Sequence, residues 1–258
     1  MSHPVGGAIV VPGGAGGIGR AVTVELARRG RAVVVIDHDR PRVEAVIDAV
    51  KADGGDASGI VADVLAFDSV EEVFAEAVST TDGESIAGLC YLAGLTKLRP
   101  ALELSAEEFS ETLTHNLTAQ LVWSQAAARR MRSSGGGSIV LIASVLAFGG
   151  MPRRASYAAS RGGVVQLVRT LATEWGEYQI RVNAVAPGWV DTETVRNLGT
   201  DLDRFARRAP MRRLGTPEDI VGPINFLLST DSSWVTGVSL PVDGGVLAYV
   251  GPGDPGST

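Results

Sequence analysis

The chain has 258 residues, of which 45% are hydrophobic and 20% charged, so it can bury a sizeable core. Its formal net charge is −6 and its basic runs are short, so nucleic acid and anionic membranes are not expected partners. No apolar stretch approaches the roughly 20 residues that span a bilayer, and the N-terminus lacks a signal-peptide pattern. The single cysteine, Cys90, lies in an apolar run, as expected of a core thiol in a reducing compartment. These observations favour a cytoplasmic protein.

Short β-type runs alternate with helical patterns along the whole chain. Strands are expected near residues 8–12, 32–37, 58–62, 86–92, 138–143, 180–186 and 237–241. Amphipathic helices are expected near residues 17–29, 40–52, 67–79, 105–132, 155–176 and 216–229. This alternation predicts an α/β fold with helices on both faces of a parallel sheet. Because we find no linker and no internal repeat, we expect one domain over residues 1–250 and a flexible tail over 251–258.

The first strand-to-helix turn carries a glycine cluster that runs from Gly13 to Gly19. Glycines let the backbone approach a ligand closely, and the N-terminus of the following helix favours an anion, so a pyrophosphate would fit there. The same cluster is also compatible with a purely structural tight turn. The second strand ends in Asp37, whose carboxylate can bind the ribose 2′-hydroxyl of NAD and would repel the 2′-phosphate of NADP. We therefore expect NAD to be preferred over NADP.

Polar or small residues follow the other strands of the predicted sheet. In an open parallel sheet, ligands bind beyond the carboxyl ends of the strands. The residues at these ends are Asp63-Val64, Ala93-Gly94, Ser144, Pro187-Gly188 through Thr192, and Val242 through Gly245. Asp63 could accept a hydrogen bond from an adenine amino group or could equally be a helix cap. Several such residues on one edge predict a binding site.

Ser144, Tyr157 and Arg161 form the candidate chemical group. Tyr157 and Arg161 are four residues apart on a predicted helix, so their side chains share a face, although such a pair is often only structural. Bringing a phenol from a pKa near 10 to near 7 takes roughly 4 kcal/mol. One cation about 4 Å away, at an effective dielectric constant of 20, supplies on the order of 4 kcal/mol. A fixed positive neighbour at that distance is therefore sufficient in size to lower the pKa of Tyr157 in this way.

Together, these motifs resemble the short-chain dehydrogenase/reductase family. The residues that carry the resemblance are Gly13, Gly17, Ile18, Gly19, Asp37, Asp63-Val64, Asn116, Ser144, Tyr157, Pro187-Gly188 to Thr192, and Val242 to Gly245. The stretch from Arg213 to Gly245 is similar to the β-ketoacyl-reductase-like branch. The resemblance implies a single Rossmann-type domain with a doubly wound, seven-stranded parallel sheet. It also implies an oxidoreductase that interconverts a secondary alcohol and a ketone with NAD(H).

The resemblance also assigns roles to individual residues. Catalysis would fall to Asn116, Ser144, Tyr157 and Arg161. The cofactor would be bound by Gly13, Gly17, Ile18, Gly19, Asp37, Asp63, Val64, Ala93, Gly94, Tyr157, Arg161, Pro187, Gly188, Val190 and Thr192. Tyr157 would act as general acid and base while the nicotinamide exchanges hydride with the substrate carbon, and Ser144 would hold the substrate oxygen. No metal site is expected.

Three positions depart from the family pattern. Arg161 stands where the family has lysine, and because arginine keeps its proton, a proton relay through that side chain is lost. Pro12 replaces a threonine, and Tyr91-Leu92 replaces an Asn-Asn pair. Since the family residues at these positions hydrogen-bond each other between neighbouring strands, their joint loss predicts one correlated change in packing and an altered mode of cofactor binding.

Two other functions remain open from the sequence. Ser144, Tyr157 and Arg161 match the Ser-Tyr-Arg triad of halohydrin dehalogenases, relatives that form epoxides without nicotinamide and have lost the glycine loop. This chain keeps the loop, together with Asp37 and Thr192, which favours the oxidoreductase. The third hypothesis is a non-catalytic nucleotide-binding or scaffold protein.

The substrate and the assembly are less clearly indicated. The segment Glu193 to Pro210 corresponds to the family's substrate lid, and its arginines, at 196, 204, 207 and 208, fit a solvated helix face better than an anion clamp. The helices near 105–132 and 155–176 carry more apolar side chains than one sheet surface can bury, namely Leu117, Leu121, Val122, Val165, Leu167 and Val168. We therefore expect a homo-oligomer, a dimer or, by family resemblance, a tetramer, acting on a small-molecule alcohol or ketone.

Overall fold

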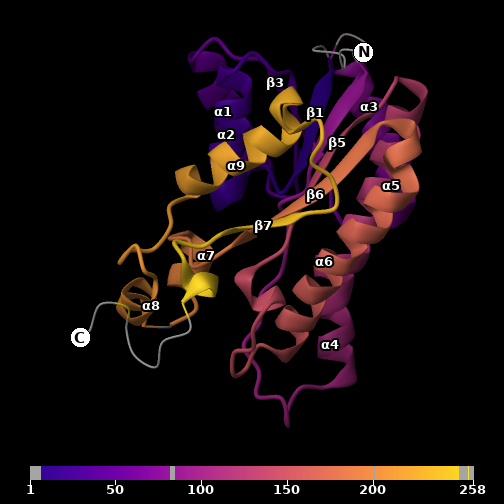
Figure 1. Cartoon of the computed structure of the whole chain (residues 1–258). Helices are drawn as coiled ribbons and strands as arrows, with labels where there is room; N and C mark the ends of the chain where they lie inside the picture. The colour runs from indigo at the N-terminus through magenta and orange to yellow at the C-terminus, as the bar shows by residue number, and fades with distance from the viewer. Residues whose placement is uncertain (1–6, 82–84, 200, 250–254, 256–258) are drawn as a thin grey trace.

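A computed structural model describes residues 7–81, 85–199, 201–249 and 255. The predicted flexible tail, 251–258, lies outside the described residues except for position 255. Within the described part, strands and helices alternate as the sequence predicts (Figure 1).

The centre of the molecule is a seven-stranded sheet in which every pairing is parallel. The strands are β1 (Ala8–Pro12), β2 (Val33–Asp37), β3 (Ala57–Val61), β4 (Ile86–Cys90), β5 (Gly137–Ile142), β6 (Ile180–Pro187) and β7 (Ser239–Val242). Their order across the sheet is β3-β2-β1-β4-β5-β6-β7. The chain direction across the sheet therefore reverses between β1 and β4, which is where such folds open a ligand crevice. The predicted doubly wound fold is confirmed.

Helices cover both faces of this sheet. One face carries α1 (Gly17–Arg28), α2 (Arg40–Ala52) and α9 (Pro217–Leu228). The other carries α3 (Val70–Ser79), α5 (Ala119–Ser133) and α6 (Ala155–Trp175), as Figure 1 shows. Each face has its own apolar cluster, because β-branched strand residues alternate between the two sides and meet the buried stripes of the helices. Within the described chain, no helix is both long and apolar enough to cross a membrane.

The helix predicted over 105–132 is continuous but irregular. It consists of α4 (Ala106–Leu113), a π-helical turn over Thr114–Thr118, and α5. A capping box fixes the start of α4: Glu108 N–H donates to Ser105 Oγ, and Ser105 N–H donates to the Glu108 carboxylate. The π turn places Asn116 inside the protein, and such turns are frequent at functional sites.

Two short helices between β6 and α9 lie in the segment that the family resemblance assigns to a substrate lid. They are α7 (Glu193–Arg196) and α8 (Leu202–Arg208), and Figure 1 shows them together, away from the helical layers. The Trp189 ring stacks on the Phe205 ring with 3.6 Å between centroids, which holds α8 against the segment that follows β6. The sequence predicted an insert here but not these two helices.

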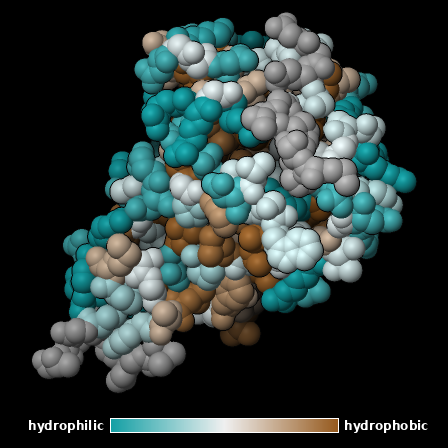
Figure 2. Space-filling view, turned by 45° about the horizontal axis from the view of Figure 1, so that its top comes forward, coloured by the Kyte–Doolittle hydropathy of each residue, from teal (hydrophilic) through white to brown (hydrophobic). Residues whose placement is uncertain are grey.

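Apolar side chains also reach the surface. On the face seen in Figure 2, hydrophobic residues gather toward the middle and hydrophilic residues surround them. The exposed large hydrophobic side chains of the described residues are Val61, Leu102, Phe148, Met211, Phe226, Trp234 and Val238. Of the six apolar residues that suggested an oligomer, Val165 and Val168 are buried and the other four are half-buried. Cys90 is a free, fully buried thiol whose pKa is raised by burial, as expected of a core residue.

Candidate active site

A cavity of about 400 Å³ opens at the carboxyl ends of the central strands. All predicted site residues except Asp63 and Asn116 line it: Gly13, Gly17, Ile18, Gly19, Asp37, Val64, Ala93, Gly94, Ser144, Tyr157, Arg161, Pro187, Gly188, Val190 and Thr192. The cavity therefore extends from the glycine loop and Asp37 at one end to Ser144 and Tyr157 at the other.

The glycine loop leaves no room for side chains at its key positions. Gly13 has a φ of 78°, and a Cβ there would lie 2.5 Å from the backbone nitrogen of Ala93. A Cβ at Gly19 would lie 2.0 Å from the carbonyl oxygen of Gly13. A Cβ at Gly17 would lie 3.0 Å from the Thr192 side chain. The N-terminus of α1 begins at Gly17 without a side-chain cap, so its positive end is available to an anion in the cavity.

Asp37 ends β2 at one end of the cavity, as predicted. Its Oδ1 accepts a hydrogen bond from Asp39 N–H at 3.3 Å and lies 3.2 Å from Nδ1 of His38. Arg42, which sequence reasoning missed, lines the cavity here as well. Its Nε lies 3.2 Å from Asp39 Oδ2, and its Nη2 donates to Glu193 Oε2 at 3.2 Å. Arg42 thus links α2 to α7 and shares its charge with two carboxylates.

Asp63 and Val64 follow β3, but only Val64 lines the cavity. The Asp63 Oδ1 accepts a hydrogen bond from Leu65 N–H at 2.9 Å, which closes the turn after the strand. Trp123 Nε1 donates to the carbonyl oxygen of Val64 at 3.0 Å and fixes the same turn from the side of α5. Asp63 therefore closes a turn and caps neither the helical turn that begins at Phe67 nor α3.

Ser144, Tyr157 and Arg161 come together at the other end of the cavity. Ser144 follows β5 in extended backbone, and Tyr157 and Arg161 lie one turn apart on α6. The Cζ atom of Arg161 is 5.0 Å from the centroid of the Tyr157 ring. Burial alone would raise the pKa of Tyr157, but the Arg161 charge, hydrogen bonds with Ser144 and Arg161, and the charge of Arg154 outweigh it, so the pKa lies below its ordinary value.

The Arg161 side chain is 4% exposed and held in a fixed position. Its Nη1 donates to the carbonyl oxygen of Ile142 at 2.7 Å, whereas its buried Nε has no hydrogen-bond partner among the described residues. A Cβ at Gly94 would lie 2.5 Å from its Nη2, so glycine at that position makes room for the guanidinium. Arginine at position 161 is therefore accommodated by the strand end opposite it.

The other two departures from the family pattern lie beside each other. The backbone N–H groups of Leu92 and Ala93 both donate to the carbonyl oxygen of Pro12, at 2.8 and 3.1 Å. The main chain thus joins the ends of β1 and β4. Tyr91 is fully buried, its hydroxyl has no hydrogen-bond partner in the described part of the chain, and its pKa is raised by burial in spite of the Arg161 charge.

Asn116 is fully buried in the π turn and does not line the cavity. Its Oδ1 accepts a hydrogen bond from Leu95 N–H, and its Nδ2 donates to the Leu95 carbonyl, both at 2.8 Å, and to Ser160 Oγ at 3.2 Å. Gln120, which sequence reasoning missed, donates from Nε2 to the carbonyls of Asn116 and Ile142 at 2.6 and 3.1 Å. In this structure Asn116 positions the loop after β4.

Sequence reasoning also missed Thr96, Arg154 and Trp189, which line the cavity. In the sequence, Arg154 stands out only as part of the short basic run Arg153-Arg154. Its position three residues before Tyr157 could have indicated that it lies near that side chain. Its Cζ lies 5.6 Å from the Tyr157 ring centroid, and its charge is one of those that lower the pKa of this phenol. The four lid arginines, at 196, 204, 207 and 208, are exposed and do not line the cavity, in agreement with a solvated face.

Comparisons with known proteins agree with this geometry. Residues 13–247 match the family model described as Enoyl-(Acyl carrier protein) reductase. L-rhamnose 1-dehydrogenase (NAD(P)(+)) of Azotobacter vinelandii is 36% identical over 246 residues, which cover 92% of this chain and 95% of that protein. The chain belongs to the short-chain dehydrogenase/reductase family.

Further members of the short-chain dehydrogenase/reductase family support the assignment. The 2-dehydro-3-deoxy-D-gluconate 5-dehydrogenase of Escherichia coli is 37% identical over 243 residues, covering 93% of this chain and 94% of that protein. Among solved structures, a 7α-hydroxysteroid dehydrogenase complexed with NADH and 7-oxo glycochenodeoxycholic acid superposes with a TM-score of 0.89 at 30% identity, covering 93% of each chain. The similarity spans the whole domain, including both ends of the cavity.

Proposed function

We propose that this short-chain dehydrogenase/reductase interconverts a secondary alcohol and a ketone with NAD(H), and that Tyr157 is its general acid and base. The observation that carries the proposal is the meeting of Tyr157, Ser144 and Arg161 in a cavity that continues to the glycine loop. Two of its relatives, an NAD(P)(+)-dependent sugar dehydrogenase and a hydroxysteroid dehydrogenase complexed with NADH, support the same chemistry.

The residues that line the cavity are suited to hold a dinucleotide. The bare loop from Gly13 to Gly19, at the start of α1, would hold the pyrophosphate, and Asp37 would hold a ribose. Tyr157 and Arg161 would hold the ribose next to the nicotinamide, and the segment from Pro187 to Thr192 would contact the nicotinamide itself. When bound, the cofactor supplies or accepts the hydride.

The residues of the chain handle the proton. In oxidation, the Tyr157 phenolate would accept the alcohol proton; in reduction, the phenol would donate a proton to the carbonyl oxygen. Ser144 would donate a hydrogen bond to that oxygen. Arg161 favours the phenolate because its charge lowers the Tyr157 pKa, but its guanidinium cannot itself carry the proton away. The proton would therefore leave Tyr157 through Ser144 or solvent in the cavity.

The preference for NAD over NADP rests on charge at the Asp37 end. A 2′-phosphate there would meet the Asp37 carboxylate, and the nearby cation, Arg42, is already shared between Asp39 and Glu193. A 2′-hydroxyl, in contrast, can donate to Asp37.

A redox-neutral reaction is the second candidate, because Arg161 gives this site a Ser-Tyr-Arg triad. The open glycine loop and Asp37 argue for a nucleotide in the pocket that such an enzyme would use for halide. A non-catalytic nucleotide-binding protein would need the loop but not the lowered pKa of Tyr157.

One set of measurements separates the three functions. NAD and NADP are titrated into the protein, and NADH formation is followed over a panel of secondary alcohols for wild type and Tyr157→Phe. We expect tighter binding of NAD and loss of most turnover in the variant. Epoxide formation from a halohydrin without cofactor would favour the redox-neutral enzyme. Tight NAD binding without hydride transfer to or from any substrate would favour the non-catalytic protein.

A further inference from the structure

Arg154 is a buried cation at the substrate end of the cavity. Its side chain is 3% exposed and lines the cavity. Nη1 donates to Thr96 Oγ1, and the buried Nε has no hydrogen-bond partner among the described residues. None of the ion pairs found in the described part of the chain includes it, and burial lowers its pKa. Its polar and ring contacts are with Thr96 and Tyr157, and a buried cation with no carboxylate partner is costly, so an anion that binds in the cavity would stabilise it.

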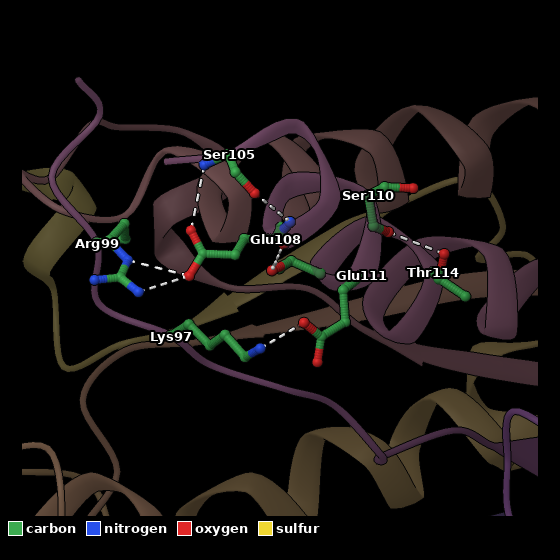
Figure 3. A network of polar contacts seen from close by, with 8 residues as sticks. Lys97, Arg99, Ser105, Glu108, Ser110, Glu111 and Thr114 are labelled. Carbon is green, nitrogen blue, oxygen red and sulfur yellow. Dashed lines mark hydrogen bonds and ion pairs between the residues drawn. The ribbon is translucent and has the colours of Figure 1, made fainter. Parts of the chain in front are cut away.

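The neighbouring cations differ from Arg154 in having carboxylate partners. Lys97 Nζ lies 2.5 Å from Glu111 Oε2, and Arg99 Nη2 lies 2.8 Å from Glu108 Oε1, as Figure 3 shows. Both carboxylates belong to α4, and both cations belong to the loop after β4. Arg154 therefore lacks a carboxylate partner although acidic residues lie nearby, and it shares this lack with Arg161, the other buried arginine that lines the cavity.

The same contacts hold Arg154 in place. The ion pairs of Lys97 and Arg99 anchor the loop that presents Thr96. The backbone N–H of Arg99 donates to the carbonyl oxygen of Arg153 at 3.0 Å, which ties this loop to the segment just before α6. The guanidinium is thus positioned before any ligand arrives, so a ligand that binds it need not order it.

The substrate end of the cavity is positively charged. Arg154 and Arg161 lie 5.6 and 5.0 Å from the Tyr157 ring centroid, measured from Cζ. Among the described residues that line the cavity, the one carboxylate is Asp37, at the end of β2. Arg161 is committed to Tyr157 and Ile142, which leaves Arg154 for the substrate.

We propose that Arg154, with Thr96, binds a carboxylate of the substrate, so that the enzyme acts on small hydroxy acids and the corresponding oxo acids. The inference rests on the proposed function in placing the reacting carbon at Tyr157. A single planar guanidinium beside one hydroxyl matches a carboxylate in charge and shape. A phosphate dianion would call for more positive charge than this end of the cavity offers.

Calorimetry with substrate-sized ligands that do not react tests the inference. Butyrate, butyramide and inorganic phosphate are titrated into the protein in the presence of NAD⁺. We expect butyrate to bind about 10- to 100-fold more tightly than butyramide, the range typical of a charged hydrogen bond. Equal affinity for the acid and the amide, or tighter binding of phosphate than of butyrate, overturns it.

Variants then assign the effect to Arg154. Arg154→Gln should lose most of the preference for the acid while keeping its affinity for the amide, and Arg154→Lys should keep part of the preference. Arg153→Gln is the matched control because it removes an adjacent, exposed arginine that does not line the cavity. A preference for the acid that survives in Arg154→Gln, or that Arg153→Gln removes equally, refutes the assignment. The comparison of butyrate with butyramide in the wild-type protein does not depend on whether any variant folds.

Turnover separates this inference from the proposed function. Rates of NADH formation are compared for 3-hydroxybutyrate and 3-hydroxybutyramide. Selective binding of the acid with no hydride transfer refutes the proposed function and leaves Arg154 as a carboxylate site. Hydride transfer from the amide as fast as from the acid, with no difference in binding, leaves the proposed function standing and overturns the inference.

Discussion

Arg161→Ala should raise the pKa at which Tyr157 becomes active. The guanidinium of Arg161 is buried 5.0 Å from the centre of the Tyr157 ring and lowers the pKa of this phenol. At that distance and an effective dielectric constant of 20, the interaction amounts to about 3 kcal/mol. The loss of this interaction raises the pKa of the phenol.

The direction of the effect follows from which form the cation stabilises. A positive charge favours the phenolate, so its removal makes the phenol hold its proton to higher pH. Oxidation needs the phenolate, and its rate rises with pH through the Tyr157 pKa. That rising limb should therefore lie at higher pH in Arg161→Ala than in wild type. Arg161→Lys keeps the charge and should keep or raise the activity.

The assay is the pH dependence of kcat/KM for NAD⁺ reduction by a secondary alcohol, in wild type and in both variants. Tyr157→Phe supplies the baseline, and Arg153→Gln controls for the loss of an exposed positive charge. An unchanged limb in Arg161→Ala would show that the cation does not control the acidity of Tyr157. If Arg161→Lys loses activity as completely as Arg161→Ala, the geometry of the guanidinium matters more than its charge, and the redox-neutral reaction gains support.

Three further predictions concern the cofactor, the loop and the assembly. Asp37→Ser should improve NADP affinity about 10-fold relative to NAD by removing like-charge repulsion, and unchanged ratios of dissociation constants would contradict this. Asn116→Ala should lower the free energy of unfolding by about 2–4 kcal/mol, because it leaves the backbone N–H and carbonyl of Leu95 without their hydrogen bonds to Asn116. A denaturant titration measures this free energy. The exposed Trp234 and the half-buried apolar residues of α5 lead us to expect a homo-oligomer, most simply a tetramer, and light scattering that finds a monomer at micromolar concentration refutes it.

The sequence predicted the parts of the site that depend on local spacing. The glycine loop, Asp37 and Ser144 each end a buried apolar run, so a strand assignment alone brings them to one edge of the sheet. The spacing of Tyr157 and Arg161 likewise fixes their shared face on α6. These inferences required only that the strands be parallel, and the alternation with helices predicted that.

Long-range contacts determine the remainder, and the sequence does not display them. Thr96 faces Arg154 because the loop after β4 is held to α4 by Arg99 and Glu108. Asn116 turns toward Leu95 because a π turn interrupts an otherwise regular helix, and periodicity cannot reveal such a turn. Arg42 lines the cavity and donates a hydrogen bond to Glu193, which is far from it in the sequence.

Arg154 and Arg161, the two arginines beside Tyr157, have different roles if Arg154 binds the substrate. Both lower the pKa of the phenol in the free enzyme. A substrate carboxylate would neutralise much of the Arg154 charge, and the phenolate would lose that part of its stabilisation as the complex forms. Arg161 is then the cation that continues to favour the phenolate in the complex, since it is buried and donates a hydrogen bond to the carbonyl oxygen of Ile142. Because an arginine side chain keeps its proton, it is well suited to this role, which is a physical reason for arginine at position 161.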